Sequence, residues 1–155
     1  MIKNTLFFLV GCICLFTSCL KSGLDDIEDS DLCALSSITM EHRWIVQNSS
    51  GYDQLTRQPL TLSKNSPDEN NTIRFTLTVP AASNAFTTEV RNSVSLEKLY
   101  LVTVISAASK IAPLNGAPAL GLPGSFEIGK EYQYEVTAAN GKKAVYTLVI
   151  EDFVK

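Results

Sequence analysis

The chain has 155 residues, of which 45% are hydrophobic, and its 16 acidic and 13 basic side chains give a formal net charge of −3. That length suits one domain of ordinary size behind a short leader. The near balance of charge excludes a basic protein that binds nucleic acid through phosphate contacts.

The first element is an N-terminal leader. One positive charge, Lys3, precedes an apolar run from Leu6 to Phe16. That run is shorter than the about 20 residues that cross a bilayer and fits the about 7–15 of a secretory core. Two small residues then precede Cys19, as lipoprotein signal peptidase requires. We therefore predict a lipoprotein signal peptide over residues 1–18 and lipid attachment, with its acyl chains, at Cys19.

Two alternatives for the leader stay open. The tetrapeptide that ends at Cys12 also resembles a lipobox. Cleavage before Cys12, however, would leave an apolar core of only Leu6–Val10 in the signal peptide and would keep several apolar residues at the mature N-terminus. The other alternative is an ordinary signal peptide in which Cys19 is incidental.

Cysteine usage agrees with the lipid anchor. Cys12 and Cys14 leave with the leader and Cys19 takes lipid, so Cys33 remains as the single thiol of the mature chain. One thiol excludes a disulfide framework or a thiolate metal site within one mature chain. We expect Cys33 to pack as a small hydrophobic residue.

Acidic residues crowd into the stretch after the anchor: Asp25, Asp26, Glu28, Asp29 and Asp31. Residues 32–155 hold eleven acidic and eleven basic residues, so that domain is neutral. We interpret residues 19–31 as the lipidated cysteine and a solvated tether, which reaches about 40 Å when extended. Early acidic residues resemble the surface-export signal of Bacteroidetes-type lipoproteins, which implies an outer-membrane, cell-surface location. A plain linker on a periplasm-facing lipoprotein is the alternative.

Strand patterns recur along residues 32–155. Ser37–Val46 alternates, with Met40, His42, Trp44 and Val46 on one face. Thr72–Val79 alternates as well, and the nearly continuous apolar segment Leu99–Ile105 suits a central strand. Shorter strands are expected at Leu60–Leu62, near Lys110–Leu114 and near Phe126, whereas no stretch has a convincing helical period.

The clearest prediction is a C-terminal hairpin. Tyr132–Val136 alternates, Asn140-Gly141 suits a type I′ turn, and Ala144–Ile150 runs back. Residues 138, 139, 142 and 143 can lengthen the loop. We expect Tyr134, Val136, Tyr146 and Leu148 in the core. Short strands separated by turn signals predict an all-β fold, an Ig-like β-sandwich over residues 32–155.

A family resemblance rests on the C-terminal half. The segments Ser106–Gly116, Gly124–Glu127, Tyr134–Gly141 and Tyr146–Ile150 resemble Ig-like or cadherin-like domains of unknown function in Bacteroidetes surface lipoproteins. In that pattern an apolar residue leads into Pro and Gly, and the chain ends in a "Tyr-x-Val-Thr-Ala-x-Asp-Gly" hairpin, with Asn140 here in place of Asp. The resemblance implies the fold and carries over no active site.

Residues with catalytic chemistry are sparse. His42 is the single imidazole, and its place on an alternating strand beside Trp44 favours packing over metal binding. No nucleophile elbow, phosphate loop or dinucleotide motif occurs, and Asp53, Asp68 and Glu69 match no calcium loop. We therefore predict no enzyme, cofactor or metal.

Aromatic side chains are the remaining functional signal, because sugar rings stack on exposed aromatic faces. Trp44 and Tyr52 are the candidate ligand-binding residues. With the membrane anchor, they favour a surface accessory binding module for glycan capture or adhesion. The alternative is a structural or assembly subunit of an envelope protein complex.

Overall fold

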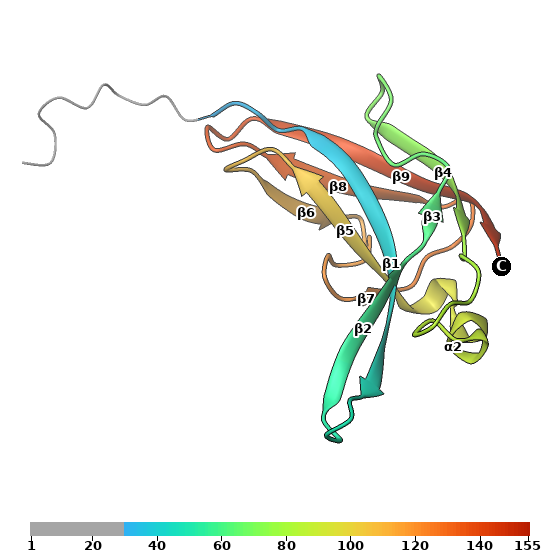
Figure 1. Cartoon of the computed structure of the whole chain (residues 1–155). Helices are drawn as coiled ribbons and strands as arrows, with labels where there is room; N and C mark the ends of the chain where they lie inside the picture. The colour runs from blue at the N-terminus through green and yellow to red at the C-terminus, as the bar shows by residue number, and fades with distance from the viewer. Residues whose placement is uncertain (1–29) are drawn as a thin grey trace, which may run out of the picture.

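The computed structural model describes residues 30–155, which form two β-sheets packed face to face (Figure 1). The all-β sandwich predicted from the sequence is confirmed. The predicted signal peptide, Cys19 and most of the acidic tether lie outside the described residues. Within residues 30–155, no helix is long and apolar enough to cross a membrane.

The first sheet has the strand order β2-β1-β5-β7 and is antiparallel throughout. Its longest strand, β1 (Leu35–Gln47), pairs with β5 (Leu99–Ile105) along its first half and with β2 (Asp53–Pro59) along its second half. The two-residue strand β7 (Pro123–Gly124) forms the other edge of this sheet.

The second sheet has the order β3-β4-β9-β8-β6. Its centre is β9 (Lys143–Val154), which pairs antiparallel with β8 (Glu131–Thr137) and parallel with β4 (Thr72–Thr78). The short strands β3 (Thr61–Leu62) and β6 (Lys110–Leu114) form the two edges.

The core fills the space between the sheets, because the inward positions of each alternating strand are apolar. Ile73, Phe75 and Leu77 of β4 are buried, as the period-2 pattern predicted. The four hairpin residues expected in the core, Tyr134, Val136, Tyr146 and Leu148, are all buried as well. Cys33 is partly buried and packs against this core.

Several predicted elements differ in detail. Asn140-Gly141 does not form a type I′ turn, because Gly141 has φ +88° but Asn140 is not among the residues with positive φ. The hairpin loop is longer, with hydrogen bonds from the Gly141 N–H to the Ala138 carbonyl and from the Ala138 N–H to the Lys142 carbonyl. The strand expected near Phe126 lies just before it, at β7.

Three elements carry no clear signal in the sequence. These are β2, the short helix α2 (Thr88–Ser93) and a 3₁₀ turn at Leu96–Lys98. Thr87 caps α2 by accepting a hydrogen bond from the Val90 N–H. Asp53, expected in a polar loop, is the first residue of β2.

Candidate functional site

The most prominent surface feature is a hairpin that projects from the sandwich (Figure 1). β1 pairs with β5 only as far as Glu41, and beyond that residue it pairs with β2 alone. We call this projecting part, residues 42–58, the arm. At its base, Leu60 donates its N–H to the Met40 carbonyl and is buried, after which the chain crosses into the second sheet at β3.

The tip of the arm is a tight, hydrogen-bonded turn. The Asn48 side-chain oxygen accepts hydrogen bonds from the N–H groups of Ser50 and Tyr52, both at 3.0 Å. Gly51 has φ +80°, a conformation that glycine adopts without the Cβ clash of other residues. This turn presents Tyr52 with 72% of its surface exposed. The tip therefore holds an exposed aromatic ring on an ordered loop.

The inner face of the arm carries an aromatic cluster of His42, Trp44 and Phe86. The His42 ring stacks on the Trp44 ring with centroids 5.7 Å apart, and Phe86 lies 5.8 Å from Trp44 at a tilted angle. His42 and Phe86 are buried, while Trp44 is half-buried. Since Phe86 comes from the segment before α2, the cluster joins the base of the arm to that segment.

Three ring nitrogens in this cluster have no hydrogen-bond partner among the described residues. They are Nδ1 and Nε2 of His42 and Nε1 of Trp44, all buried. Buried polar groups are usually paired, so this arrangement is uncommon. Burial lowers the pKa of His42, because desolvation disfavours the charged imidazolium. The neutral ring keeps one donor and one acceptor beside the indole donor.

The outer face of the first sheet holds a buried carboxylate at the base of the arm. The Glu41 side chain is only 5% exposed and makes an ion pair of 2.9 Å with Arg43 and a longer one of 3.5 Å with Arg57. The Arg43 guanidinium also lies over the Tyr100 ring, 4.4 Å from its centroid. A buried charge needs such partners, because its desolvation is unfavourable. The four side chains come from β1, β2 and β5, so their contacts connect the three strands at the base of the arm.

On the same face, closer to the tip of the arm, two apolar side chains are exposed to solvent. Ile45 and Leu55 are opposite one another in the β1–β2 ladder and are 63% and 64% exposed. Directly opposed side chains in an antiparallel pair are in contact, so the two form one small patch. Together with Tyr52, the arm exposes three large side chains near its end.

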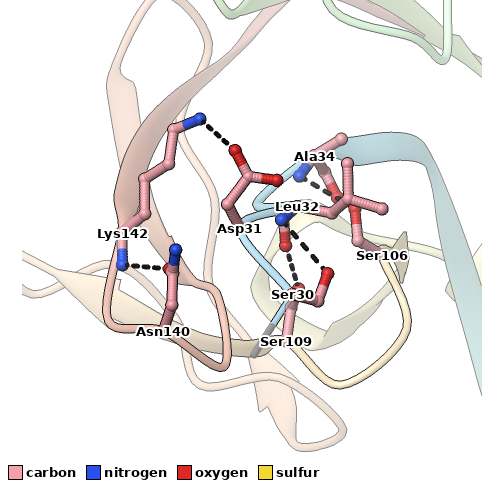
Figure 2. A network of polar contacts seen from close by, with 8 residues as sticks. All are labelled: Ser30, Asp31, Leu32, Ala34, Ser106, Ser109, Asn140 and Lys142. Carbon is pink, nitrogen blue, oxygen red and sulfur yellow. Dashed lines mark hydrogen bonds and ion pairs between the residues drawn. The ribbon is translucent and has the colours of Figure 1, made fainter. Parts of the chain in front are cut away.

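The chain enters the domain at the pole opposite the arm tip. Figure 2 shows how the residues before β1 are held there by the turn after β5 and by the hairpin loop between β8 and β9. Ser109 donates to the Leu32 carbonyl at 2.7 Å, and Lys142 makes an ion pair of 3.1 Å with Asp31. Because β1 runs from this pole toward the tip over 13 residues, the two ends are about 40 Å apart.

The two residues predicted to bind ligand thus lie on different parts of the arm. Tyr52 is exposed at the tip, whereas Trp44 lies in the aromatic cluster between His42 and Phe86. The Ile45–Leu55 patch and the Glu41 cluster were missed, because they depend on the register of β2 against β1. Residues 30–155 contain no group of three His, Cys, Asp or Glu side chains placed to hold a metal ion.

Comparison with known proteins gives a family and one related structure. A crystal structure from Bacteroides fragilis NCTC 9343, provisionally described as a secreted protein, has a TM-score of 0.70 and 26% sequence identity. The similarity covers 81% of this chain and 98% of that one. No curated protein matches the chain. The profile of the DUF5018-related family matches residues 35–149, from the first residue of β1 into β9. The chain therefore belongs to the DUF5018-related family.

Proposed function

We propose that the protein is a secreted, lipid-anchored module of the cell envelope and that it makes an adhesive contact through the arm. The observation that carries this proposal is the exposed Ile45–Leu55 patch on a hairpin that projects from the sandwich. Apolar side chains clustered on a projecting element are typical of protein interaction sites. The proposal includes no catalytic step.

The location of the protein is supported by two observations. The leader and Cys19 have the pattern of an exported lipoprotein. The related Bacteroides fragilis protein is described as secreted, which agrees with export to the envelope or beyond. An anchor before residue 30 then holds the domain by one pole. The arm tip lies at the far pole, where a partner outside the membrane can reach it.

The test is site-specific photo-crosslinking of the full chain in whole cells. A photoreactive phenylalanine analogue at Ile45 or Leu55 should give crosslinked adducts. The matched controls place the same residue at Val145 and Ile128, which are exposed apolar positions elsewhere on the domain. Adducts at the arm alone support the proposal, and equal or no adducts at all four positions would contradict it. The adduct's identity separates adhesion from a role as an assembly subunit, since the latter predicts a partner from the same envelope complex.

Glycan capture is the second candidate, and the exposed Tyr52 ring favours it. A sugar can stack on this ring while nearby Ser49 and Ser50, also exposed, offer hydroxyl groups. Binding of the mature protein to a glycan array should then be lost in Tyr52→Ala and kept in Tyr52→Phe. Equal binding by wild type and Tyr52→Ala would exclude the tip as the glycan site.

A further inference from the structure

We propose that the free edge of β2 pairs antiparallel with β2 of a second copy of this chain, about a twofold axis at Leu55. This inference rests on the proposed function and deepens it, because it names the partner of the arm. It follows from three observations on the arm: an unpaired strand edge, the direction of its backbone groups, and the side chains along it.

β2 is the longest of the four edge strands in the two sheets of residues 30–155. It pairs only with β1, and its other side has no neighbour in the sheet (Figure 1). Of the other edges, β3 and β7 have two residues each, and β6 contains Lys110 and Pro113. Short strands, lysine and proline all protect an edge from further pairing. β2 offers seven residues in which proline appears only at the end, Pro59.

The β1–β2 ladder fixes which backbone groups point outward. Leu60 donates to the Met40 carbonyl, and Asn48 donates to the Tyr52 carbonyl. In the observed register these are directly opposed residues, so they are hydrogen-bonded pairs. Pairs alternate along an antiparallel ladder, so the even-numbered residues of β2 bond to β1. The odd-numbered residues, Asp53, Leu55 and Arg57, therefore direct their N–H and C=O groups to the open edge.

This alternation selects the register of a twofold pair. With the axis at Leu55, that residue opposes its own copy, and Asp53 opposes the partner's Arg57. All three N–H groups and all three carbonyls of each edge are then used, which gives six interchain hydrogen bonds. Moving the axis to Thr56 would bring Pro59, which has no N–H, opposite the partner's Asp53. The Asp53 carbonyl would then have no donor, whereas an axis at Leu55 pairs every N–H and C=O group of Asp53, Leu55 and Arg57.

The side chains of β2 are complementary to themselves in this register. Asp53, Leu55 and Arg57 share the outer face with Ile45, because their β1 partners are the odd-numbered residues. Each Asp53 carboxylate would lie beside the partner's Arg57 guanidinium, twice by symmetry. Arg57 is 70% exposed, and its one ion pair within the described residues is the 3.5 Å contact with Glu41. The two Ile45–Leu55 patches would also join into one continuous apolar row across the axis.

The direction of the strands places the two anchored poles at opposite ends of the pair. β1 of one copy runs antiparallel to β1 of the other, and each begins at the pole where its chain enters. From Leu35 to Ile45 the strand extends about 33 Å, so the two β1 origins lie about 65 Å apart. An upright pair of this kind joins two facing surfaces, which is what an adhesive contact requires.

The test is disulfide trapping of the full chain on whole cells. Opposed residues of a hydrogen-bonded pair have Cα atoms about 5.5 Å apart, within the range that a disulfide spans. Leu55→Cys should therefore give a disulfide-linked dimer on a non-reducing gel. Gln54→Cys is the matched control, because the same residue of the partner is not opposite it. Wild type controls for the native cysteines. If Leu55→Cys gives no more dimer than Gln54→Cys, the pairing is refuted.

The register is tested by mixing two single variants. Asp53→Cys and Arg57→Cys chains that carry tags of different size should crosslink with each other and not with themselves. Self-linked Asp53→Cys would overturn the axis at Leu55. In the Leu55→Cys background, Asp53→Arg should lower the dimer yield about tenfold, because arginine would face the partner's Arg57. Glu151→Arg, an equal change of charge at an exposed site on β9, should leave the yield unchanged.

The outcomes separate this inference from the proposed function. If photo-crosslinking at Leu55 captures a different protein while disulfide trapping yields no dimer, the arm is a binding site and the self-pairing is wrong. If neither experiment gives an adduct, both the proposed function and the self-pairing fail. A pairing of two short strands buries less surface than a stable interface does, so we expect dimers where two cell surfaces are in contact and dissociation in dilute solution.

Discussion

His42 lies on the inner face of β1, with both ring nitrogens buried and unpartnered within residues 30–155. The alternating pattern of β1 correctly predicted that His42 and Trp44 share one face. It could not predict that the ring would lack a hydrogen bond, because that depends on which side chains of β2 and of the segment before α2 approach it. Because burial without a partner costs a charged ring more than a neutral one, this site favours the neutral imidazole over the imidazolium.

We therefore predict that His42 makes the fold sensitive to acid. Its pKa is lowered in the folded state, so below the ordinary value of about 6.5 the unfolded chain binds more protons. The free energy of unfolding should fall as the pH drops from about 6.5 toward the folded pKa of His42. Above about pH 6.5 the ring is neutral in both states, so titration of His42 should add no pH dependence. Urea denaturation of residues 20–155 between pH 7.5 and 5 measures the effect.

The matched variant for this experiment is His42→Phe, which keeps an aromatic ring beside Trp44 and removes the titrating group. Its free energy of unfolding should change less over the same pH range than that of wild type. A titration of the His42 ring by NMR gives an independent value. A pKa at or above the ordinary value for histidine would show that the ring is solvated or paired.

Among the strands, those that bury one face were predictable from sequence. β1, β4, β5, β8 and β9 all occur where period-2 or continuous apolar patterns placed them, because burial of alternate residues is what such patterns encode. β2 was missed because its residues, from Asp53 to Pro59, include one large apolar side chain, Leu55. An exposed arm strand is held by its ladder to β1, and ladder pairing leaves little trace in composition.

The C-terminal hairpin was also predictable only in part. Its strands and its four core residues were predictable, whereas its turn type was not. Asn140-Gly141 allows two positive φ values but does not enforce them, and the loop instead uses the bonds between Ala138, Gly141 and Lys142. The Asn140 side chain accepts a hydrogen bond from the Lys142 N–H, which favours this longer loop.

This hairpin gives a stability prediction at two positions. Gly141→Val should destabilise the domain by about 1–3 kcal/mol, because its backbone stays at φ +88° and no neighbouring atom lies within 4 Å to add a clash. Leu148→Ala should destabilise it by about 2–5 kcal/mol, because Leu148 is buried in the core. The measurement is the free energy of unfolding from urea denaturation of residues 20–155.

Each substitution has a control on the same hairpin. Gly141→Asn should be milder than Gly141→Val, since asparagine tolerates positive φ. Val145→Ala on β9 should change stability by less than about 0.5 kcal/mol, because Val145 is an exposed surface position. If Leu148→Ala were as mild as Val145→Ala, the hairpin would not be part of the cooperative core.

On the scale of the whole molecule, the described domain has two structurally different ends. The pole at which the chain enters is fixed by Asp31, Ser106, Ser109 and Lys142, which are residues from three separate segments (Figure 2). The far end is the arm. Sequence alone indicated the anchor and the aromatic candidates, but not this polarity, because it arises from β1 extending past β5 to form the arm.

The proposed function requires that the chain is anchored to the membrane before residue 30. We predict that Cys19→Ala abolishes incorporation of labelled palmitate and retention in the membrane fraction. Cys12→Ala should retain both, because Cys12 lies within the predicted signal peptide, residues 1–18. Stable anchoring takes two acyl chains or more, which the thioether-linked lipid at Cys19 would supply. The measurement is metabolic labelling followed by fractionation of cells that express each full-length variant. Labelled palmitate on the Cys19→Ala protein would disprove the assignment, and labelling lost only in Cys12→Ala would move the anchor to that residue.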